Sequence, residues 1–339
     1  IGVGGLKDIT TGAQNVAIGT NAMPLATLFG TFGSNYRNVA IGYDAAVNAN
    51  GLGTSVQNRQ NVVIGYGVAP SLSSGNYNAI VGTIANVNQA STSETVAIGF
   101  GALGESLAVA IGSAAGAYGT GSVAIGFNAL ALNNESVAIG LTSVNSDRAI
   151  GIGVNTPIPG SCPGVVVIGS DIGISTATGS VAIGRESNTN KVHTVTVGPN
   201  SLARGGEGVA IGYFSSATGA RGISIGFNNL ANSTGSIAIG VGTRSSSTSI
   251  AIGSPAYSQG PGGGIAIGTS SNATGSKSIS IGVSSFCTGQ DSVAIGNTAA
   301  STVQDGVAIG TNAGCTSTAS ICIGKNTTSG GTNSIQIGN

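Results

Sequence analysis

Residues that could carry out acid–base, nucleophilic or metal chemistry are few and scattered along this chain of 339 residues. The single histidine, His193, has no cysteine or carboxylate near it at a spacing typical of metal ligands. The acidic residues are isolated, as at Glu94, Glu135 and Asp305, so no carboxylate pair predicts general acid–base catalysis. We therefore expect a protein that is not an enzyme, with no catalytic residue and no metal site.

The cysteines and glycines predict no cofactor site either. The four cysteines are too few and too unevenly spaced for a disulfide scaffold, and they form no C-x-x-C pair for zinc. They are Cys162, Cys287, Cys315 and Cys322. No phosphate-binding loop of the type G-x-x-x-x-G-K-[ST] occurs, and no helix is predicted after Gly151-Ile152-Gly153, as a dinucleotide site would require.

Charge and hydropathy exclude two further classes of partner. The 11 basic and 11 acidic residues balance and form no runs, so we expect no nucleic-acid binding and no attraction to anionic membranes. No apolar run approaches the roughly 18 to 20 residues that cross a bilayer, so we expect no membrane insertion by this segment. Any targeting or anchoring segment is expected to lie outside these residues.

The dominant feature is a repeated motif, Val/Ile-x-Ile/Val-Gly, whose closing residue we call the marker glycine. From Gly99 onward successive marker glycines follow at a nearly constant interval of about 14 positions, as from Gly296 to Gly310. The interval is longer near the start of the chain, where Gly42 is followed only by Gly65. β-Branched residues that alternate at period two predict a short strand, and the glycine predicts a tight corner.

A second short strand is predicted after each marker glycine, where the third and fifth following residues are small, as at Ala129 and Ala131. Turn residues such as Thr274-Gly275 then return the chain to the next motif. Cys287 and Cys315 both take the fifth position, two copies apart and so about 9 to 10 Å from each other. That separation is beyond the reach of a disulfide.

Each 14-residue unit is therefore predicted to be one rung of two strands and two corners. Such a rung is too small to fold alone and must stack on the next copy about 4.8 Å away. We expect an all-β fold, a parallel β-roll or β-solenoid of about 23 short rungs. We interpret it as one continuous domain, in which 1–98 contains longer, irregular rungs with loop insertions and 99–339 contains the regular 14-residue rungs.

The central residue of the motif predicts how chains assemble. We expect the two β-branched side chains to face the interior, which places the central residue on the outer face. That residue is alanine in thirteen copies, and a row of small uncharged side chains favours close packing against another chain. The subunit-interface candidates are Ala97, Ala110, Ala124, Ala138, Ala182, Ala210, Ala238, Ala294 and Ala308.

The unit Ser-Val-Ala-Ile-Gly-x-x-Ala-x-Ala, which begins at Ser122 and recurs with one alanine from Ser292, closely resembles the head repeat of YadA-like trimeric autotransporter adhesins. The resemblance covers nearly the whole chain. It implies a left-handed parallel β-roll, a side-by-side homotrimer and an extracellular role in holding a surface or a matrix protein. The longer copies ending at Gly42 and Gly65 also resemble shaft repeats of viral and phage tail fibres, and fold alone does not choose between them.

Candidate ligand contacts lie at one corner of the rungs and in insertions. Aromatic residues directly follow several marker glycines, where they either cover the corner and stack on one another or bind a glycan or protein. Insertions in a solenoid become loops on one face, and the two that we single out are 23–32 and 155–164. The ligand-contact candidates are Leu25, Leu28, Phe29, Tyr43, Tyr66 and Phe100.

Four Asn-x-Ser/Thr sequons lie outside the Val/Ile strand and are candidate glycosylation sites, namely Asn134, Asn232, Asn272 and Asn326. Together these features predict an extracellular or cell-surface adhesin head, a stiff rod that attaches through many weak contacts. Its expected partners are itself, as a homotrimer or filament, and a host matrix protein or surface glycan. The alternative is the shaft of a viral or phage tail fibre on a virion surface, or a self-assembling structural filament.

Overall fold

The computed structural model of the chain describes Val3 and residues 12–22, 35–46, 60–70, 72, 75–87 and 92–338. All regular elements in these residues are β-strands, and the strands pair in parallel, as in β10 with β12 and in β36 with β38. This confirms the expected all-β parallel solenoid. The chain forms two compact units, residues 1–170 and 171–339. The predicted boundary at residue 98 lies inside the first unit and stays a prediction about rung length.

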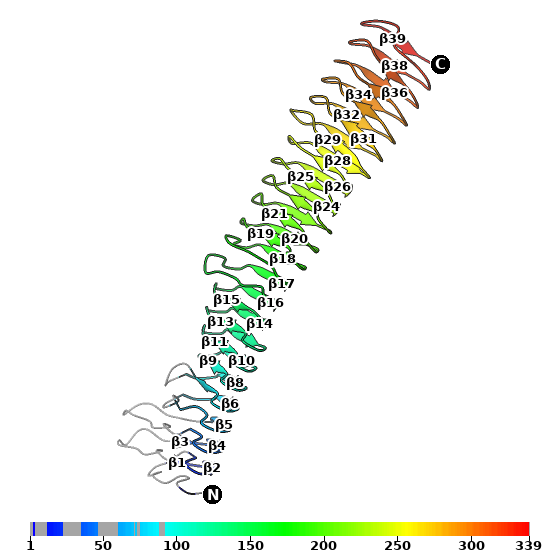
Figure 1. Cartoon of the computed structure of the whole chain (residues 1–339). Helices are drawn as coiled ribbons and strands as arrows, with labels where there is room; N and C mark the ends of the chain where they lie inside the picture. Colours follow the sequence, from blue (N-terminus) through cyan, green and yellow to red (C-terminus); the bar gives the residue numbers. More distant parts are fainter. Residues whose placement is uncertain are drawn as a thin grey trace. The chain divides into compact units, whose positions relative to one another are not determined.

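In the first unit the Val/Ile motifs build one parallel sheet, which we call the Val/Ile sheet (Figure 1). Successive motifs pair in register, so that Val109 lies beside Val123 and Ile111 beside Ile125. The strands are β2 (Val16–Ile18), β4 (Val39–Ile41), β5 (Val62–Ile64), β6 (Ala79–Val81), β8 (Val96–Ile98), β10 (Val109–Ile111), β12 (Val123–Ile125), β14 (Val137–Leu141), β16 (Ile150–Val154) and β17 (Val166–Ser170).

The second strand of each rung forms the opposite side of the coil, which we call the small-residue sheet. In the first unit it consists of β7 (Asn86–Val87), β9 (Leu103–Gly104), β11 (Gly116–Ala117), β13 (Leu130–Ala131) and β15 (Ser143–Val144), all parallel. A separate parallel pair joins β1 (Gly12–Ala13) to β3 (Asn35–Tyr36). Two short strands therefore alternate along the chain, as the repeat predicts.

The second unit repeats this plan. Its Val/Ile sheet contains β18 (Val181–Ile183), β20 (Val195–Val197), β22 (Val209–Ile211), β24 (Ile223–Phe227), β26 (Ile237–Val241), β28 (Ile250–Gly253), β30 (Ile265–Ile267), β32 (Ile279–Ile281), β34 (Val293–Ile295), β36 (Val307–Ile309), β38 (Ile321–Ile323) and β39 (Ile335–Ile337). Its small-residue sheet contains β19 (Asn188–Thr189), β21 (Leu202–Ala203), β23 (Ser216–Ala217), β25 (Leu230–Ala231), β27 (Arg244–Ser245), β29 (Ala256–Ser258), β31 (Ser271–Ala273), β33 (Phe286–Cys287), β35 (Ala300–Ser301) and β37 (Gly314–Cys315).

The interior of each unit is filled mainly by small side chains, and most of the β-branched residues of the motif do not enter it. In β12 and β22 the central alanine is buried, whereas the flanking valine and isoleucine stay partly exposed. The small residues of the second strand, such as Ala129 and Ala131, are also buried, as predicted. The alternation is therefore confirmed, but its expected phase is wrong: the alanines point inward and the β-branched residues point outward.

The reversal follows from the narrowness of the coil. Residues from both sheets meet across the interior in compact clusters, such as Ala203, Ala210 and Ala217. Where alanines face each other in this way, close packing leaves little space for a valine or isoleucine side chain, and such residues are buried at the centre of only a few of the described strands, at Val63, Ile80 and Val167. Period-two alternation shows which residues share a face, but it does not show which face points inward.

The marker glycine allows the rungs to stack this closely. Gly65 has a φ of +136°, and a Cβ atom there would lie 1.6 Å from the carbonyl oxygen of Gly82 in the next rung. Only glycine combines this backbone conformation with the absence of a side chain. The corner is thus fixed by a residue type that the repeat supplies at every turn.

Candidate functional site

The most extensive surface feature is the outer side of the Val/Ile sheet, which we call the Val/Ile face. Because the strands pair in parallel register, equivalent residues of successive rungs lie side by side, as Ile295 does between Ile281 and Ile309. Neighbouring rungs cover part of each side chain, yet Ile111 is 37% exposed and Ile295 is 36% exposed. From β8 onward both outward positions of every rung are valine or isoleucine. In each unit the face is therefore a continuous, uncharged apolar surface.

The predicted subunit-interface residues do not lie on this face. All nine are 0% exposed, namely Ala97, Ala110, Ala124, Ala138, Ala182, Ala210, Ala238, Ala294 and Ala308. Their methyl groups pack inside the coil, so they cannot touch another chain, and this part of the prediction is wrong. The valines and isoleucines on either side of them are the residues that the surface exposes. The signal for these was present in the sequence, because they are the most uniform positions of the repeat.

The corner after the marker glycine carries exposed aromatic side chains, as the sequence predicts. Tyr43 and Tyr66 are 47% and 58% exposed and stack with ring centroids 5.4 Å apart. Phe100 is 58% exposed. In the second unit Tyr213 stacks on Phe227 at 5.7 Å. Stacking between neighbouring rungs is therefore observed, and ligand contact by Tyr43, Tyr66 and Phe100 stays a prediction.

The other candidate ligand contacts, Leu25, Leu28 and Phe29, lie with the insertion 23–32 outside the described residues. After Phe127 the row of corner residues continues with aliphatic side chains. Phe127, Leu141 and Val154 follow successive marker glycines and are 62%, 45% and 53% exposed. In β14 and β16 the strand runs on through the glycine, so Leu141 pairs with Val154 at the edge of the Val/Ile face.

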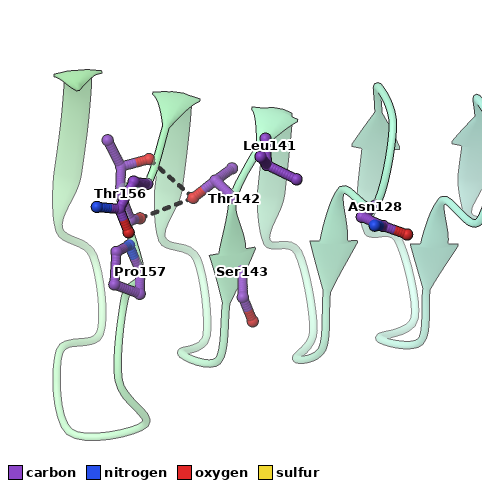
Figure 2. Close-up of a pocket in the computed structure, with 7 residues that line it drawn as sticks. Asn128, Leu141, Thr142, Ser143, Thr156 and Pro157 are labelled. Carbon is purple, nitrogen blue, oxygen red and sulfur yellow. Dashed lines mark hydrogen bonds between the residues drawn. The ribbon is translucent and has the colours of Figure 1, made fainter. Parts of the chain in front are cut away.

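A shallow pocket of about 230 Å³ opens beside this corner in the first unit (Figure 2). It is lined by Asn128, Leu141, Thr142, Ser143, Asn155, Thr156 and Pro157. None of these side chains is charged, so the lining offers hydrogen-bonding groups and apolar contact without acid–base chemistry. Such a mixture suits a neutral polar ligand with some apolar surface.

Two threonines form a rigid polar base beside the pocket (Figure 2). The Thr156 hydroxyl donates a hydrogen bond to the Thr142 hydroxyl at 2.7 Å, and the Thr142 hydroxyl donates to the Thr156 carbonyl at 2.7 Å. Thr156 is 0% exposed and Thr142 is 5% exposed, so these groups satisfy each other inside the protein. The other lining residues, Asn128, Leu141, Ser143, Asn155 and Pro157, are at least partly exposed and form the rim.

The insertion 155–164 supplies part of this rim, although much of it belongs to the coil. Ile158 pairs with Val144 as an extra bridge of the small-residue sheet and is 1% exposed. The Ile158 amide donates to the Ser143 carbonyl at 2.8 Å. Cys162 is also buried. The exposed residues of the insertion are Asn155, Pro157, Gly160, Ser161 and Gly164.

His193 and the acidic residues singled out from the sequence lie at exposed corners and do not converge. His193 has a φ of 54°, and its amide donates to the Thr178 carbonyl of the preceding rung at 3.0 Å. Glu94, Glu135 and Asp305 have the same left-handed conformation at the equivalent corner. Among the described residues, no group of three His, Cys, Asp or Glu side chains could hold a metal ion. In the same residues, no helix is long and apolar enough to cross a membrane.

The candidate glycosylation sites differ in accessibility. Asn134, Asn232 and Asn326 are exposed, whereas Asn272 lies in β31 and is only partly exposed. Asn272 also has a buried Oδ1 atom. Modification at these four positions stays a prediction, and the geometry favours the first three.

Comparison with known families singles out the regular rungs. A search of curated proteins finds no match for this chain. A profile described as the YadA head domain repeat, two copies long, matches residues 107–129, 117–143, 175–201, 203–229, 217–243, 262–285 and 288–313. Each matched segment spans Val/Ile strands, marker glycines and small-residue strands as described above. The matched segments, which all lie between residues 107 and 313, are thus YadA-like head repeats, the repeats of trimeric autotransporter adhesin heads.

Proposed function

We propose that this chain is the head of an extracellular, homotrimeric adhesin fibre whose subunits pack side by side through the Val/Ile face. The observation that carries the proposal is the unbroken valine and isoleucine surface on rungs of the YadA head type. An apolar surface repeated at every rung is costly in water and marks an interaction site. The role is attachment and display, without catalysis.

Sister chains are the partner that fits this face best. Every rung presents the same two side chains at the spacing of a parallel sheet, so an identical chain in register meets matching ridges and grooves along the whole unit. No charge on the face opposes close approach. Closed rotational symmetry lets each copy cover the face of a neighbour, and head repeats of this family form trimers.

Sedimentation equilibrium on matched lysine variants tests this assembly. Ile295→Lys combined with Ile323→Lys places charges on two positions of the Val/Ile face that are each 36% exposed. Burying several ammonium groups together is strongly unfavourable, so we expect this variant to be monomeric at concentrations where the unaltered chain is trimeric. Phe286→Lys, at an outward position of β33 that is 40% exposed, is the control and should stay trimeric.

A folded, stable monomer of the unaltered chain at micromolar concentration would contradict the proposal. Equal dissociation of the Phe286→Lys control would mean that the small-residue sheet, rather than the Val/Ile face, carries the contact. Circular dichroism of each variant, measured alongside, shows that a lost trimer is not an unfolded chain.

Ligand contact is proposed for the exposed corner and the adjoining pocket. Phe127 and Leu141 offer apolar surface, and Asn128 and Asn155 offer amide groups beside it. Three copies of such a corner would attach through several weak contacts at once. We expect Phe127→Ser with Leu141→Ser to reduce retention on immobilised matrix proteins or glycans at least tenfold. Phe286→Ser is the control, and equal retention by both variants would remove the corner from the proposal.

A further inference from the structure

Two of the four cysteines lie in contact inside the second unit. The Sγ atoms of Cys315 in β37 and Cys322 in β38 are 3.1 Å apart, and both residues are 0% exposed. Two unbonded sulfur atoms this close are already inside ordinary van der Waals contact. A disulfide requires an S–S distance of about 2.05 Å, so side-chain rotations that move the sulfurs together by about 1 Å would bring the pair to bonding distance.

The backbone positions of this pair are fixed by the repeat and not only by the side-chain conformations. A residue of the small-residue sheet faces the residue seven positions later, at the centre of the next Val/Ile strand. The same relation joins Ala203 with Ala210 and Cys287 with Ala294 in buried clusters. Cys315 and Cys322 belong to one such cluster.

The spacing across the interior also suits a disulfide. Alanine methyl groups in contact lie within about 4 to 4.5 Å of each other, and the Cβ atoms of a disulfide are about 3.5 to 4.5 Å apart. A pair of cysteines at two facing alanine positions can therefore be joined without moving the strands. Cys287 and Cys315 both lie in the small-residue sheet, two rungs apart. Cys322 lies in the opposite sheet, where it faces Cys315 across the interior of the coil.

We propose that Cys315 and Cys322 form an intrachain disulfide when the chain folds in an oxidising compartment. Each thiol loses one proton and one electron, and a sulfur–sulfur bond replaces two S–H bonds. The two electrons and two protons pass by thiol–disulfide exchange to a disulfide oxidant, either a small-molecule disulfide or an oxidoreductase, which leaves as two thiols. The bond joins one small-residue strand to the following Val/Ile strand.

The bond must form before the rungs close. Burial, reinforced by the adjacent Cys315 thiol, raises the pKa of Cys322 to about 11, and the attacking species in exchange is the thiolate. In the folded coil the pair is therefore shielded from oxidants by both burial and protonation. Oxidation belongs to folding, when the thiols are still accessible, and the completed coil then protects the bond from reductants.

A single tryptic fragment reports the bond. Cleavage after Lys277 and Lys325 releases residues 278–325, which contain Cys287, Cys315 and Cys322. In a Cys287→Ala background the fragment carries only the proposed pair. The protein is produced by secretion into an oxidising compartment, or refolded in a mixture of reduced and oxidised glutathione. It is then denatured, alkylated with iodoacetamide without reductant, digested and weighed.

We expect an unalkylated fragment about 2 Da lighter than the dithiol, which gains two carbamidomethyl groups once reductant is added before alkylation. A fragment carrying two carbamidomethyl groups without reduction overturns the proposal, and so does a glutathione adduct or a disulfide between two chains. Adding Cys322→Ala to Cys287→Ala leaves one cysteine in the fragment, which should give one carbamidomethyl group under both conditions.

A second readout tests whether the bond holds the coil. Reductant should lower the melting temperature of the oxidised Cys287→Ala protein and leave that of the triple variant with Cys315→Ala and Cys322→Ala unchanged. Equal melting with and without reductant, where the fragment mass shows the bond reduced, would overturn a stabilising role. Neither the fragment mass nor the melting temperature depends on trimer formation. The disulfide proposal can therefore be contradicted without contradicting the proposed function, and the proposed function can be contradicted without contradicting the disulfide.

Discussion

Long rungs near the start of the first unit and the regular rungs after them bond differently at the residue that precedes the Val/Ile strand. In the long rungs this residue is asparagine, and the side chains form a ladder from rung to rung. The Asn78 backbone amide and side-chain amide both donate to the Oδ1 atom of Asn61, at 2.9 and 3.0 Å. Asn61 donates in the same way to Asn38, and its side chain also donates to the Gly75 carbonyl at 2.8 Å.

In the regular rungs serine commonly takes this position, and at several of these serines the hydroxyl bonds within its own turn. The Ser136 hydroxyl donates to the Asn133 carbonyl three residues earlier, at 2.6 Å. Ser236 and Ser292 make the same bond to Ser233 and Gly289, at 2.7 and 2.6 Å. Serine therefore closes a short local turn, whereas asparagine bonds to the rung beside it.

This difference accompanies the change in rung length between the two regions. In the regular rungs the turn before the strand is tight, and where glycine replaces serine a backbone bond closes it, as from the Gly208 amide to the Gly205 carbonyl at 3.1 Å. In the long rungs the asparagine before each strand bonds to the asparagine of the neighbouring rung. This bond fixes the start of the strand and does not depend on the number of residues between the two strands. Copies of different length can then share one sheet, as β4, β5 and β6 do.

The largest expected effect comes from the marker glycine, which both regions share. A Cβ at Gly65 would lie 1.6 Å from the Gly82 carbonyl oxygen, whereas at Gly126 it would lie 3.0 Å from that of Gly140. Gly65 and Gly126 have similar φ values, +136° and +132°. We expect Gly65→Ala to cost at least about 3 kcal/mol and Gly126→Ala about 1 to 3 kcal/mol.

Hydrogen exchange resolved by peptide measures this difference, because opening in stacked rungs is local. Faster exchange should be confined to the altered rung and its neighbours. A larger effect at Gly126 than at Gly65 would mean that the long rungs relax more easily than their close backbone contact indicates.

The asparagine ladder gives the next largest effect. Asn61→Ala removes the acceptor for two Asn78 donors and the donor to the Gly75 carbonyl, all of them buried. Buried polar groups left without a partner cost about 1 to 3 kcal/mol each, so we expect a local loss of about 2 to 4 kcal/mol. Ser136→Ala removes one local bond and should cost about 1 kcal/mol.

The two variants are compared by local exchange rates or limited proteolysis. Asn61→Ala should open the rungs on both sides, because its bonds reach into both, whereas Ser136→Ala should affect one turn. Equal spread of the two effects would contradict the distinction between bonds across rungs and bonds within a turn.

Most of the fold could be predicted from the sequence because it repeats. The spacing of the marker glycines predicted the rung, the two strands and the in-register parallel pairing, and these are seen from Val96 to Ile337. The orientation of the strand could not be derived in the same way. Alternation is equally satisfied by either phase, and the preference for burying the larger apolar side chain, which usually decides, fails in a coil this narrow.

The wrong orientation of the Val/Ile strand also limited what could be predicted of the candidate site. With Val and Ile placed inside, Ala124 and its equivalents became interface candidates, although the apolar face lies one residue to either side. The aromatic corner was found because Tyr43 and Tyr66 each follow a marker glycine, which gives a position independent of strand phase. The contact of Cys315 with Cys322 requires knowing that the centre of the strand points inward, so it could not be seen before the phase was corrected.

The smallest expected effect is a loss of stability at alkaline pH that belongs to the regular rungs alone. Burial raises the pKa of Cys322 to about 11 in the folded chain, above its ordinary value of 9.0. Below pH 9 the thiol is protonated in both states and the stability is unaffected. As the pH rises from 9 towards 11 the unfolded chain releases the proton first, so the free energy of unfolding falls, by about 2 kcal/mol at most.

Melting of the reduced protein, followed by circular dichroism from pH 8 to 10.5, should show this fall, and Cys322→Ala should flatten it. An unchanged slope in Cys322→Ala would assign the alkaline loss to other groups, such as Cys287, whose pKa burial also raises.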